Sequence, residues 1–331
     1  MSNKAKVLHA DLFFFLTVLF VIPLNIVILY ISQTTGWQMS ALANVLISQG
    51  YFIVCVSIYC LAARQKVSET LRIRKFHLGS AFLVLVLLLT ASPVAYWLNA
   101  ASQLFVTNEV ATTIYDISVD IPYLAGILVI GALPALVEEI ICRGVLLSAH
   151  SLRSLRAGII ISAVAFACLH MDFNQMAYAF FLGLLFALIV EATGSILSTM
   201  LAHAVFNAVS VSFVYLLPFI IELQESLTGM AAEMGAEEML TQGAGQSEIL
   251  LALLLLTPFA GAGLVLSGLL LYLIAKLNQR EEIFMSLYKK EYKENAPVDR
   301  SVPLVNPFLV AGFVVCLVMA LFGALATMAE Y

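Results

Sequence analysis

The sequence predicts an all-α fold, a polytopic bundle of about nine transmembrane helices with its N-terminus in the cytoplasm. Of the 331 residues, 62% are hydrophobic and only 11% are charged, with a mean hydropathy of +1.00. A soluble domain carries about 25% charged residues. Apolar stretches recur along the chain, and a helix of about 20 such residues crosses the hydrocarbon core of a bilayer.

Each apolar stretch is predicted to be one membrane-spanning helix. The predicted helices cover residues 10–32, 41–63, 77–99, 121–149, 157–170, 175–191, 194–217, 249–276 and 306–328. The first stretch is too long for a signal-peptide core and lacks a small-residue cleavage site, so we expect it to be retained. The fifth and sixth are short, which puts the turn MDFN at membrane depth. Irregular backbone at that depth is tolerated only where it is buried or lines a water-filled cavity. We therefore expect a wet pocket, opening mainly toward the cytoplasm.

The basic residues indicate the orientation. All 16 Lys and Arg residues lie in the segments 4–6, 64–75, 143–156 and 276–300, and the charged residues in the other connections are all acidic. The positive-inside rule places these basic segments in the cytoplasm and the C-terminus outside. Because the basic residues are sorted by loop, the net charge of −5 carries no information about nucleic acid, and we expect no nucleic-acid partner.

The same pattern divides the chain into four parts. Residues 1–120 are predicted as N-terminal membrane helices, and residues 121–217 as a helical catalytic core. Residues 218–248 are rich in Gly, Met and Glu and are predicted as an acidic extracytoplasmic loop. Residues 249–331 are predicted as C-terminal membrane helices. We expect a multi-pass protein of a bacterial plasma membrane.

The stretch LPALVEEIICRGVLL places Glu138, Glu139 and Arg143 inside an otherwise apolar helix. A charged side chain at the bilayer centre costs about 2.5–3.5 kcal/mol on insertion scales. Glu139 and Arg143 are spaced i, i+4 and can pair along one helix face. Glu138 points about 100° away and has no obvious partner on its own helix.

Three further polar residues reach a similar depth. His170 ends the segment FACLH, and His203 and Asn207 share a helix face in LAHAVFNAV. From the nearest cytoplasmic helix ends, Glu138 lies about 16 Å deep, His170 about 20 Å and His203 about 14 Å. One shared site explains this common depth better than three separate structural hydrogen bonds.

This set of groups suits the addition of water to a carbonyl. A desolvated carboxylate can act as a general base, a histidine can assist it or hold a metal, and donors on one face can stabilise an oxyanion. An ion-coupled transporter would also keep Glu and His at depth. The residues by themselves predict an intramembrane hydrolase or such a transporter.

The order Glu138-Glu139-x3-Arg143, Phe166-x3-His170 and His203-x3-Asn207 resembles the CAAX-protease and bacteriocin-processing (Abi) family of intramembrane proteases. The resemblance covers about residues 120–215 and includes Gly183 and the turn at 193–195. It implies peptide-bond hydrolysis, with water activated by Glu138 and His170. It further implies an oxyanion held by His203 and Asn207, and a helix organised by Glu139 and Arg143.

The cofactor and the substrate stay open at this stage. Glu138, His170 and His203 would suit zinc or another divalent metal, because three N/O ligands plus water form a catalytic site. The HExxH helix of a zincin is absent. The expected partners are the lipid bilayer and a peptide or membrane-protein substrate. The alternatives are a non-catalytic membrane scaffold or bacteriocin-immunity protein, an ion-coupled transporter, and a cysteine mechanism through Cys142 or Cys168.

Overall fold

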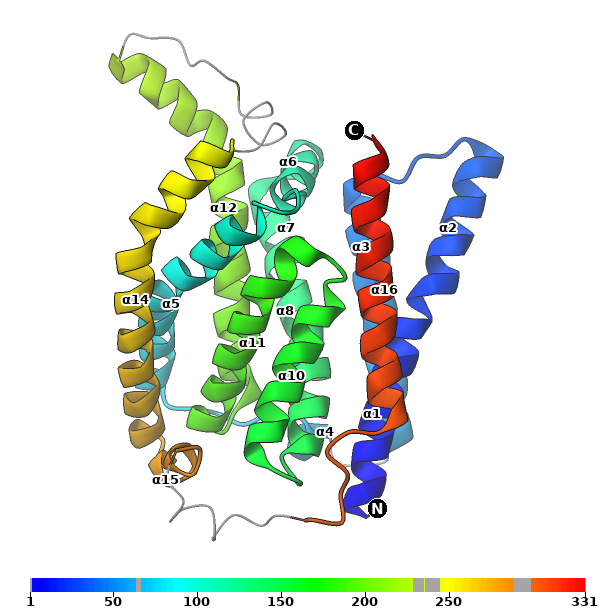
Figure 1. Ribbon diagram of the computed structural model, residues 1–331, viewed down its shortest axis with the longest axis vertical. Coiled ribbons are helices and arrows are strands. Elements are labelled where there is room, and N and C mark those ends of the chain that lie inside the picture. The colour runs from blue at the N-terminus through cyan, green and yellow to red at the C-terminus, as the bar shows by residue number, and fades with distance from the viewer. Residues whose placement is uncertain (1, 64–66, 229–234, 236–244, 289–298, 331) are drawn as a thin grey trace.

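The computed structural model describes residues 2–63, 67–228, 235, 245–288 and 299–330, and the regular elements of this part are all helical (Figure 1). The N-terminal helices are α1 (Asn3–Leu19), α2 (Val21–Thr35), α3 (Ala41–Ala63), α4 (Val67–Thr70), α5 (Leu78–Ser102) and α6 (Val110–Asp120). The central helices are α7 (Tyr123–Gly126), η1 (Ile127–Ala132), α8 (Leu133–Glu139), η2 (Ile140–Leu147), α9 (Ser148–His150), α10 (Leu155–Leu169), α11 (Phe173–Thr193) and α12 (Ile196–Thr228). The last helices are α14 (Gln246–Leu277), α15 (Glu281–Met285) and α16 (Pro307–Glu330).

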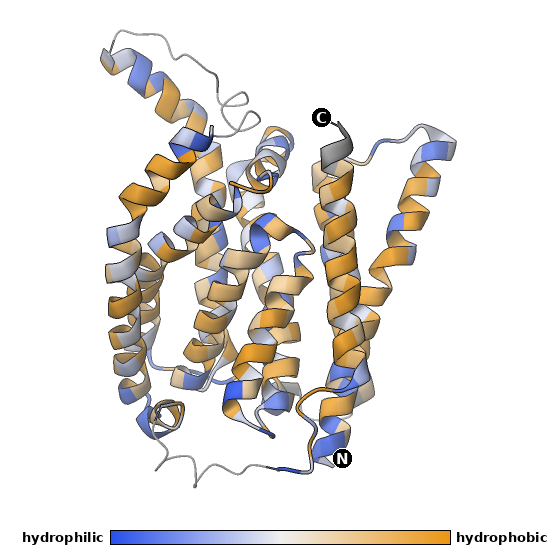
Figure 2. Ribbon diagram, in the orientation of Figure 1, coloured by the Kyte–Doolittle hydropathy of each residue, from blue (hydrophilic) through white to orange (hydrophobic). Residues whose placement is uncertain are grey.

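The predicted all-α membrane bundle is confirmed. Within the described residues, eight helices are long and apolar enough to cross a membrane, and Leu155–Leu169 is a shorter apolar helix of 15 residues. Hydrophobic residues cover most of the length of the long helices, and hydrophilic residues gather toward their ends (Figure 2). The predicted span 157–170 therefore forms the short helix α10.

Three boundaries differ from the prediction. The first span is two helices, α1 and α2, which meet at Phe20. Helix α12 continues through Pro218 to Thr228, so its last turns take up the start of the predicted 218–248 loop. A membrane helix tolerates a proline because neighbouring groups satisfy the freed backbone. Helix α6 was not predicted, since it lies in the segment between the third and fourth spans. Most of the rest of the 218–248 loop lies outside the described residues.

The helices form three groups in Figure 1. Helices α1, α2, α3 and α16 lie on one side of the bundle, and α5 packs against α14 on the other. Between them lie α10, which packs against α11 and η2, and α12, which packs against η1 and α8. The middle group contains every sequence-predicted site residue.

We call the two ends of the bundle by their charges. The basic end carries the segments 72–75, 153–156 and 276–280, and the N-terminus lies there (Figure 1). The acidic end carries Glu109, Asp120 and Glu222. The positive-inside rule predicts that the basic end faces the cytoplasm.

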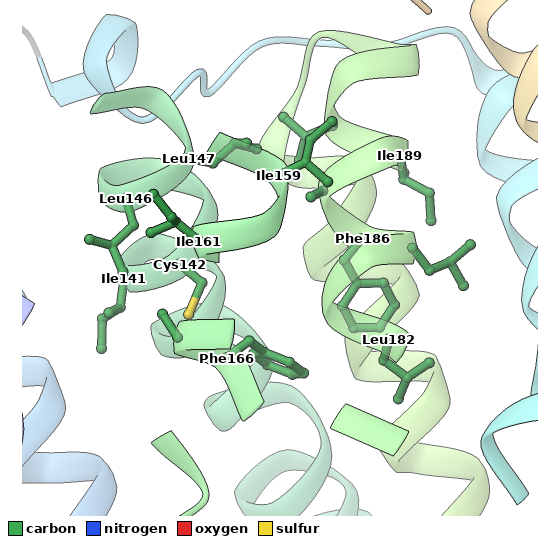
Figure 3. Close-up of a cluster of buried hydrophobic side chains, with 14 of the residues drawn as sticks. Ile141, Cys142, Leu146, Leu147, Ile159, Ile161, Phe166, Leu182, Phe186 and Ile189 are labelled. Atoms are coloured by element: carbon green, nitrogen blue, oxygen red, sulfur yellow. The ribbon is translucent and has the colours of Figure 1, made fainter. Parts of the chain in front are cut away.

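Side chains close the basic half of the middle group. Buried apolar side chains from η2, α10 and α11 form one cluster there, which includes Ile141, Leu146, Leu147, Ile159, Ile161, Phe186 and Ile189 (Figure 3). Gly183 allows α10 and α11 to approach closely, because a Cβ at this position would lie 2.8 Å from Ala163 Cα.

Polar contacts also connect the helices at the basic end of the bundle. The backbone N–H of Ile196 donates to the carbonyl oxygen of Arg72 at 3.1 Å, which ties the segment before α5 to the α11–α12 turn. The buried carboxylate of Glu191 pairs with Arg72 and, at 3.4 Å, with Nη2 of Arg280. The turn itself needs a glycine, because Gly194 has φ = 75°.

Another buried polar contact joins the first and last helices to the middle group. The imidazole Nε2 of His150 lies 2.7 Å from Asp11 Oδ1, and both side chains are fully buried. The amide of Asn306 donates to the other oxygen of Asp11. This contact lies near the basic end, where α1 packs against α9.

Candidate active site

The helix that carries the EExxxR motif is irregular on both sides of its carboxylates. A π-helical segment, Ile127–Ala132, precedes α8, and a second, Ile140–Leu147, follows it directly after Glu139. Short π-helical segments inside helices occur frequently at functional sites. The i, i+4 relation of Glu139 and Arg143 survives this irregularity.

Glu139 and Arg143 form the predicted pair. Arg143 Nη1 donates to Glu139 Oε1 at 2.7 Å, and both side chains have 0% exposure. Arg143 Nη2 donates to the carbonyl oxygen of Gly183 at 3.1 Å. The guanidinium carbon lies 4.3 Å from the centroid of the Phe166 ring and 5.3 Å from that of Phe186. Two aromatic faces and a carboxylate therefore surround this buried cation, which stabilises it through cation–π and ionic contacts.

His203 contacts the same carboxylate. Its Nδ1 lies 3.2 Å from Glu139 Oε1, and because a carboxylate only accepts, Nδ1 carries the proton. Glu139 therefore bridges Arg143 of its own helix and His203 of α12. In the neutral imidazole, Nε2 then holds the free lone pair. His203 can donate from Nε2 only when both ring nitrogens are protonated, so the oxyanion role that the resemblance implies holds for that form alone.

His170 is oriented by its own helix. Its Nδ1 lies 2.8 Å from the backbone oxygen of Phe166 and must donate to it, which again leaves Nε2 as the free nitrogen. The Phe166 ring packs edge-on against both imidazoles, with centroid distances of 5.1 Å to His170 and 5.3 Å to His203. Met171 follows with φ = 49°, a left-handed conformation that is uncommon for a residue with a side chain. This turn ends α10 at the level of the site.

One cavity of about 610 Å³ brings the remaining candidates together. Glu138, His170, His203 and Asn207 all line it. Glu138 Oε2 is buried and has no hydrogen-bond partner among the described residues. One N–H of the Asn207 amide donates to the backbone oxygen of Ile130 at 3.4 Å, which leaves the second for another acceptor. Glu139 and Arg143 are packed behind this wall and do not line the cavity.

The sequence predicts a pocket that opens mainly toward the cytoplasm, the side of the basic segments, whereas the lining of this cavity extends toward the acidic end. From the level of Glu138 and His170, the lining continues along α12 from His203 to Ser210 and along α6 from Val110 to Ile117. Residues of α2 and α3 form the facing wall. These segments lie toward the acidic end, whereas packed apolar side chains fill the basic half. The sequence did not indicate this closure, because lipid-facing and protein-facing apolar residues look alike.

The predicted metal site requires three ligands arranged around one ion. Glu138, His170 and His203 offer suitable donor atoms, namely one carboxylate oxygen and two Nε2 lone pairs. However, no group of three or more His, Cys, Asp or Glu side chains among the described residues is arranged to hold a metal ion. The arrangement of the described residues does not fit the predicted zinc site.

The cysteine alternative receives no support from the cavity. All five cysteines are free, Cys142 and Cys168 are buried, and neither lines the cavity.

Sequence reasoning missed the aromatic packing and the outer wall of the cavity. Phe166 was part of a motif but received no role, and Phe186 was not singled out. Gly183 was noted only as part of the resemblance, and its backbone oxygen proves to hold Arg143. The participation of α2, α3 and α6 left no local signal, since these helices approach the core only through tertiary packing.

Sequence comparison supports the predicted resemblance. Residues 120–209 match the family model described as type II CAAX prenyl endopeptidase Rce1-like, and this segment contains every candidate site residue. Together with the apolar helices, the match supports a multi-pass membrane endopeptidase of the CAAX-protease family. Neither the curated proteins nor the solved structures yielded a match.

Proposed function

We propose that the Rce1-like segment hydrolyses a peptide bond inside the membrane, with Glu138 as the general base that activates water. The observation that carries this proposal is the buried Glu138 Oε2, which has no hydrogen-bond partner among the described residues and lies in a cavity shared with His170, His203 and Asn207. A carboxylate in such a place retains its lone pairs for a proton of water. We further propose that the protein lies in a bacterial plasma membrane.

The first step forms a tetrahedral intermediate. Glu138 takes one proton from water, and the water oxygen bonds to the carbonyl carbon of the scissile peptide. The carbonyl π electrons move onto its oxygen, which becomes the oxyanion. In the second step the C–N bond breaks and Glu138 returns its proton to the leaving amine. The carboxylate is thereby regenerated without any further reagent.

His170 orients the water. Its Nδ1 is engaged with the Phe166 carbonyl oxygen, so Nε2 faces the reaction as a hydrogen-bond acceptor. A water molecule that donates one hydrogen to Glu138 can donate the other to this nitrogen. The two acceptors fix the water oxygen for attack, and such positioning is a large part of catalysis.

Asn207 and His203 stabilise the oxyanion. Asn207 has one N–H beyond the contact with Ile130, and a donor aimed at developing charge lowers the barrier by about 3–4 kcal/mol in comparable sites. His203 adds a second donor through Nε2 when both of its ring nitrogens are protonated. Glu139 accepts from Nδ1 in either protonation state, so it fixes the ring orientation.

Glu139 and Arg143 are positioning residues. Neither residue lines the cavity. Both act through the side chains that they contact, which do line it. Glu139 accepts a hydrogen bond from His203, and Arg143 contacts both Glu139 and the Phe166 ring, which packs against the two imidazoles.

The test compares purified full-length protein with Glu138→Gln and Glu222→Gln on a peptide library in detergent. Glu222 is an exposed carboxylate at the acidic end of α12 and provides a matched control. We expect cleavage by the wild-type protein and the control, and a rate at least about 100-fold lower for Glu138→Gln, without loss of thermal stability. A fully active Glu138→Gln variant would contradict the base assignment. A transporter or a non-catalytic scaffold would cleave no peptide in any of the three forms.

A further inference from the structure

We propose that Gln49 is a substrate-binding residue, whose side-chain amide accepts a hydrogen bond from a backbone N–H of the peptide close to the scissile bond. Gln49 belongs to α3, outside the segment 120–209 that matches the family model. This role rests on the proposed function, because it concerns the same cavity.

Gln49 lies in the cavity wall that α2 and α3 form, and it lines the same cavity as Glu138. Helix α3 packs against α8, the helix that carries Glu138, and against α6. At 1.5 Å per residue, Gln49 lies about 21 Å from the basic end of α3 at Ala63. The same count placed Glu138 about 16 Å and His170 about 20 Å deep. Gln49 therefore reaches the level of the proposed catalytic groups from another side of the cavity.

The side-chain oxygen of Gln49 is buried without a donor. The residue is 8% exposed, and its Oε1 has no hydrogen-bond partner among the described residues. Other polar side chains of α3 do have partners. The Tyr51 hydroxyl donates to the carbonyl oxygen of Thr17 at 2.6 Å, and Ser57 Oγ donates to that of Ile53 at 2.7 Å. A buried acceptor without a donor lowers stability, and natural proteins break this rule mainly at functional sites.

A peptide backbone supplies the donor that Gln49 lacks. An N–H that leaves water for an apolar cavity is costly to bury unless it finds an acceptor. In the proposed mechanism Glu138 and His170 accept from the attacking water, so those lone pairs are not available to the backbone. The Gln49 amide is a neutral acceptor on another wall. Every peptide unit except that of proline carries an N–H, so this contact positions the chain without selecting side chains.

The geometry of a trans peptide bond determines which N–H groups point toward α3. The C=O and the N–H of one trans unit point in opposite directions. When the scissile carbonyl oxygen is turned toward Asn207 of α12, the N–H of the same unit points away from α12. In an extended chain the units two positions away repeat this orientation. A hydrogen bond from one of these N–H groups to Gln49 would hold the scissile carbonyl toward its donors.

The experiment measures binding of fluorescent library peptides to full-length protein in detergent, in the Glu138→Gln background so that cleavage does not interfere. Gln49→Met removes the amide at similar side-chain length. Gln33→Met is the matched control, because Gln33 is exposed on α2 and does not line the cavity. We expect Gln49→Met to bind the tightest-binding peptide about tenfold more weakly, the effect of one hydrogen bond, and Gln33→Met to bind it as before.

Backbone methylation identifies the N–H that Gln49 accepts. The same peptide is synthesised with an N-methyl group at one backbone position at a time, which removes one donor. Where Gln49 is present, methylation of the contacted N–H should weaken binding about tenfold. In Gln49→Met the same methyl group should have little effect. This double-mutant cycle assigns the coupling to one N–H and one side chain.

Two further measurements separate substrate binding from a structural role. In the protein that retains Glu138, Gln49→Met should raise KM and leave kcat within about twofold, because the contact is made equally in the bound substrate and the transition state. The thermal unfolding midpoint of Gln49→Met should equal or exceed that of wild type, because methionine buries no acceptor without a donor.

Equal peptide binding by Gln49→Met and the control, a methylation pattern that is the same with and without Gln49, or no binding of any peptide overturns the proposal. A lower unfolding midpoint for Gln49→Met than for Gln33→Met also overturns it, because Gln49 would then stabilise the fold. Cleavage by Gln49→Met at the wild-type KM overturns it and leaves the peptidase function intact. Binding that depends on Gln49, in a protein that cleaves no peptide, supports the binding residue and counts against the peptidase function.

Discussion

Replacement of Arg143 by Ala tests whether the buried cluster around Glu139 holds the site together. The substitution removes the 2.7 Å contact to Glu139, the 3.1 Å contact to the Gly183 carbonyl oxygen, and the cation between Phe166 and Phe186. Glu139, which is not exposed to solvent, then keeps His203 at 3.2 Å and the Thr199 side chain as partners, but no permanent cation.

The expected cost follows from that isolation. Removal of one partner of a buried ion pair costs about 3–5 kcal/mol, because the remaining charge stays desolvated. His203 still donates to Glu139, so we expect the lower part of that range. Replacement of both charges, as in Glu139→Gln with Arg143→Met, should cost less than Arg143→Ala alone, because it leaves no unpaired charge.

The assay is thermal unfolding of the purified variants in detergent, with Arg72→Ala as the control. Arg72 is partly exposed and its partner Glu191 retains Arg280, so its loss should cost only about 1 kcal/mol or less. We expect the unfolding midpoint to fall most for Arg143→Ala, less for the double variant and least for Arg72→Ala. An Arg143→Ala midpoint equal to that of wild type would refute the buried pair as a stabilising unit.

Four other outcomes follow from the same structure. Glu138→Gln should lower turnover by about 10²–10⁴-fold, the usual contribution of a general base, while the unfolding midpoint holds or rises because an amide is cheaper to bury than a carboxylate. Activity should survive chelators, as measured on the same peptides; stoichiometric zinc that disappears in His203→Ala would instead establish a metal site. Asp11→Ala should destabilise the fold by about 1–3 kcal/mol, since it leaves the buried His150 without its 2.7 Å partner, and an unchanged denaturation midpoint would show that this contact is dispensable. In sealed vesicles of known orientation, a membrane-anchored reporter should be cut only when its susceptible sequence lies on the acidic, extracytoplasmic side, and cutting of the cytoplasmic version alone would show that the cavity opens elsewhere.

Local sequence determined the elements of this protein and the chemistry available to it. Apolar runs long enough for a bilayer must form helices there, because only a helix satisfies its own backbone groups in lipid. The sorting of basic residues predicts which end faces the cytoplasm. The i, i+4 spacing of Glu139 and Arg143 already implied their pair, since that contact lies within one helix.

Tertiary packing decided how those groups are used. Which carboxylate faces the cavity depends on the neighbouring helices, and Glu139 turned toward His203 of α12 while Glu138 kept a buried oxygen without a partner among the described residues. The direction of the cavity depended on α2, α3 and α6, which no motif marks. Hydropathy could not reveal either result, because a side chain against lipid and a side chain against another helix are equally apolar. Only the packed bundle distinguishes the filled basic half from the open acidic half.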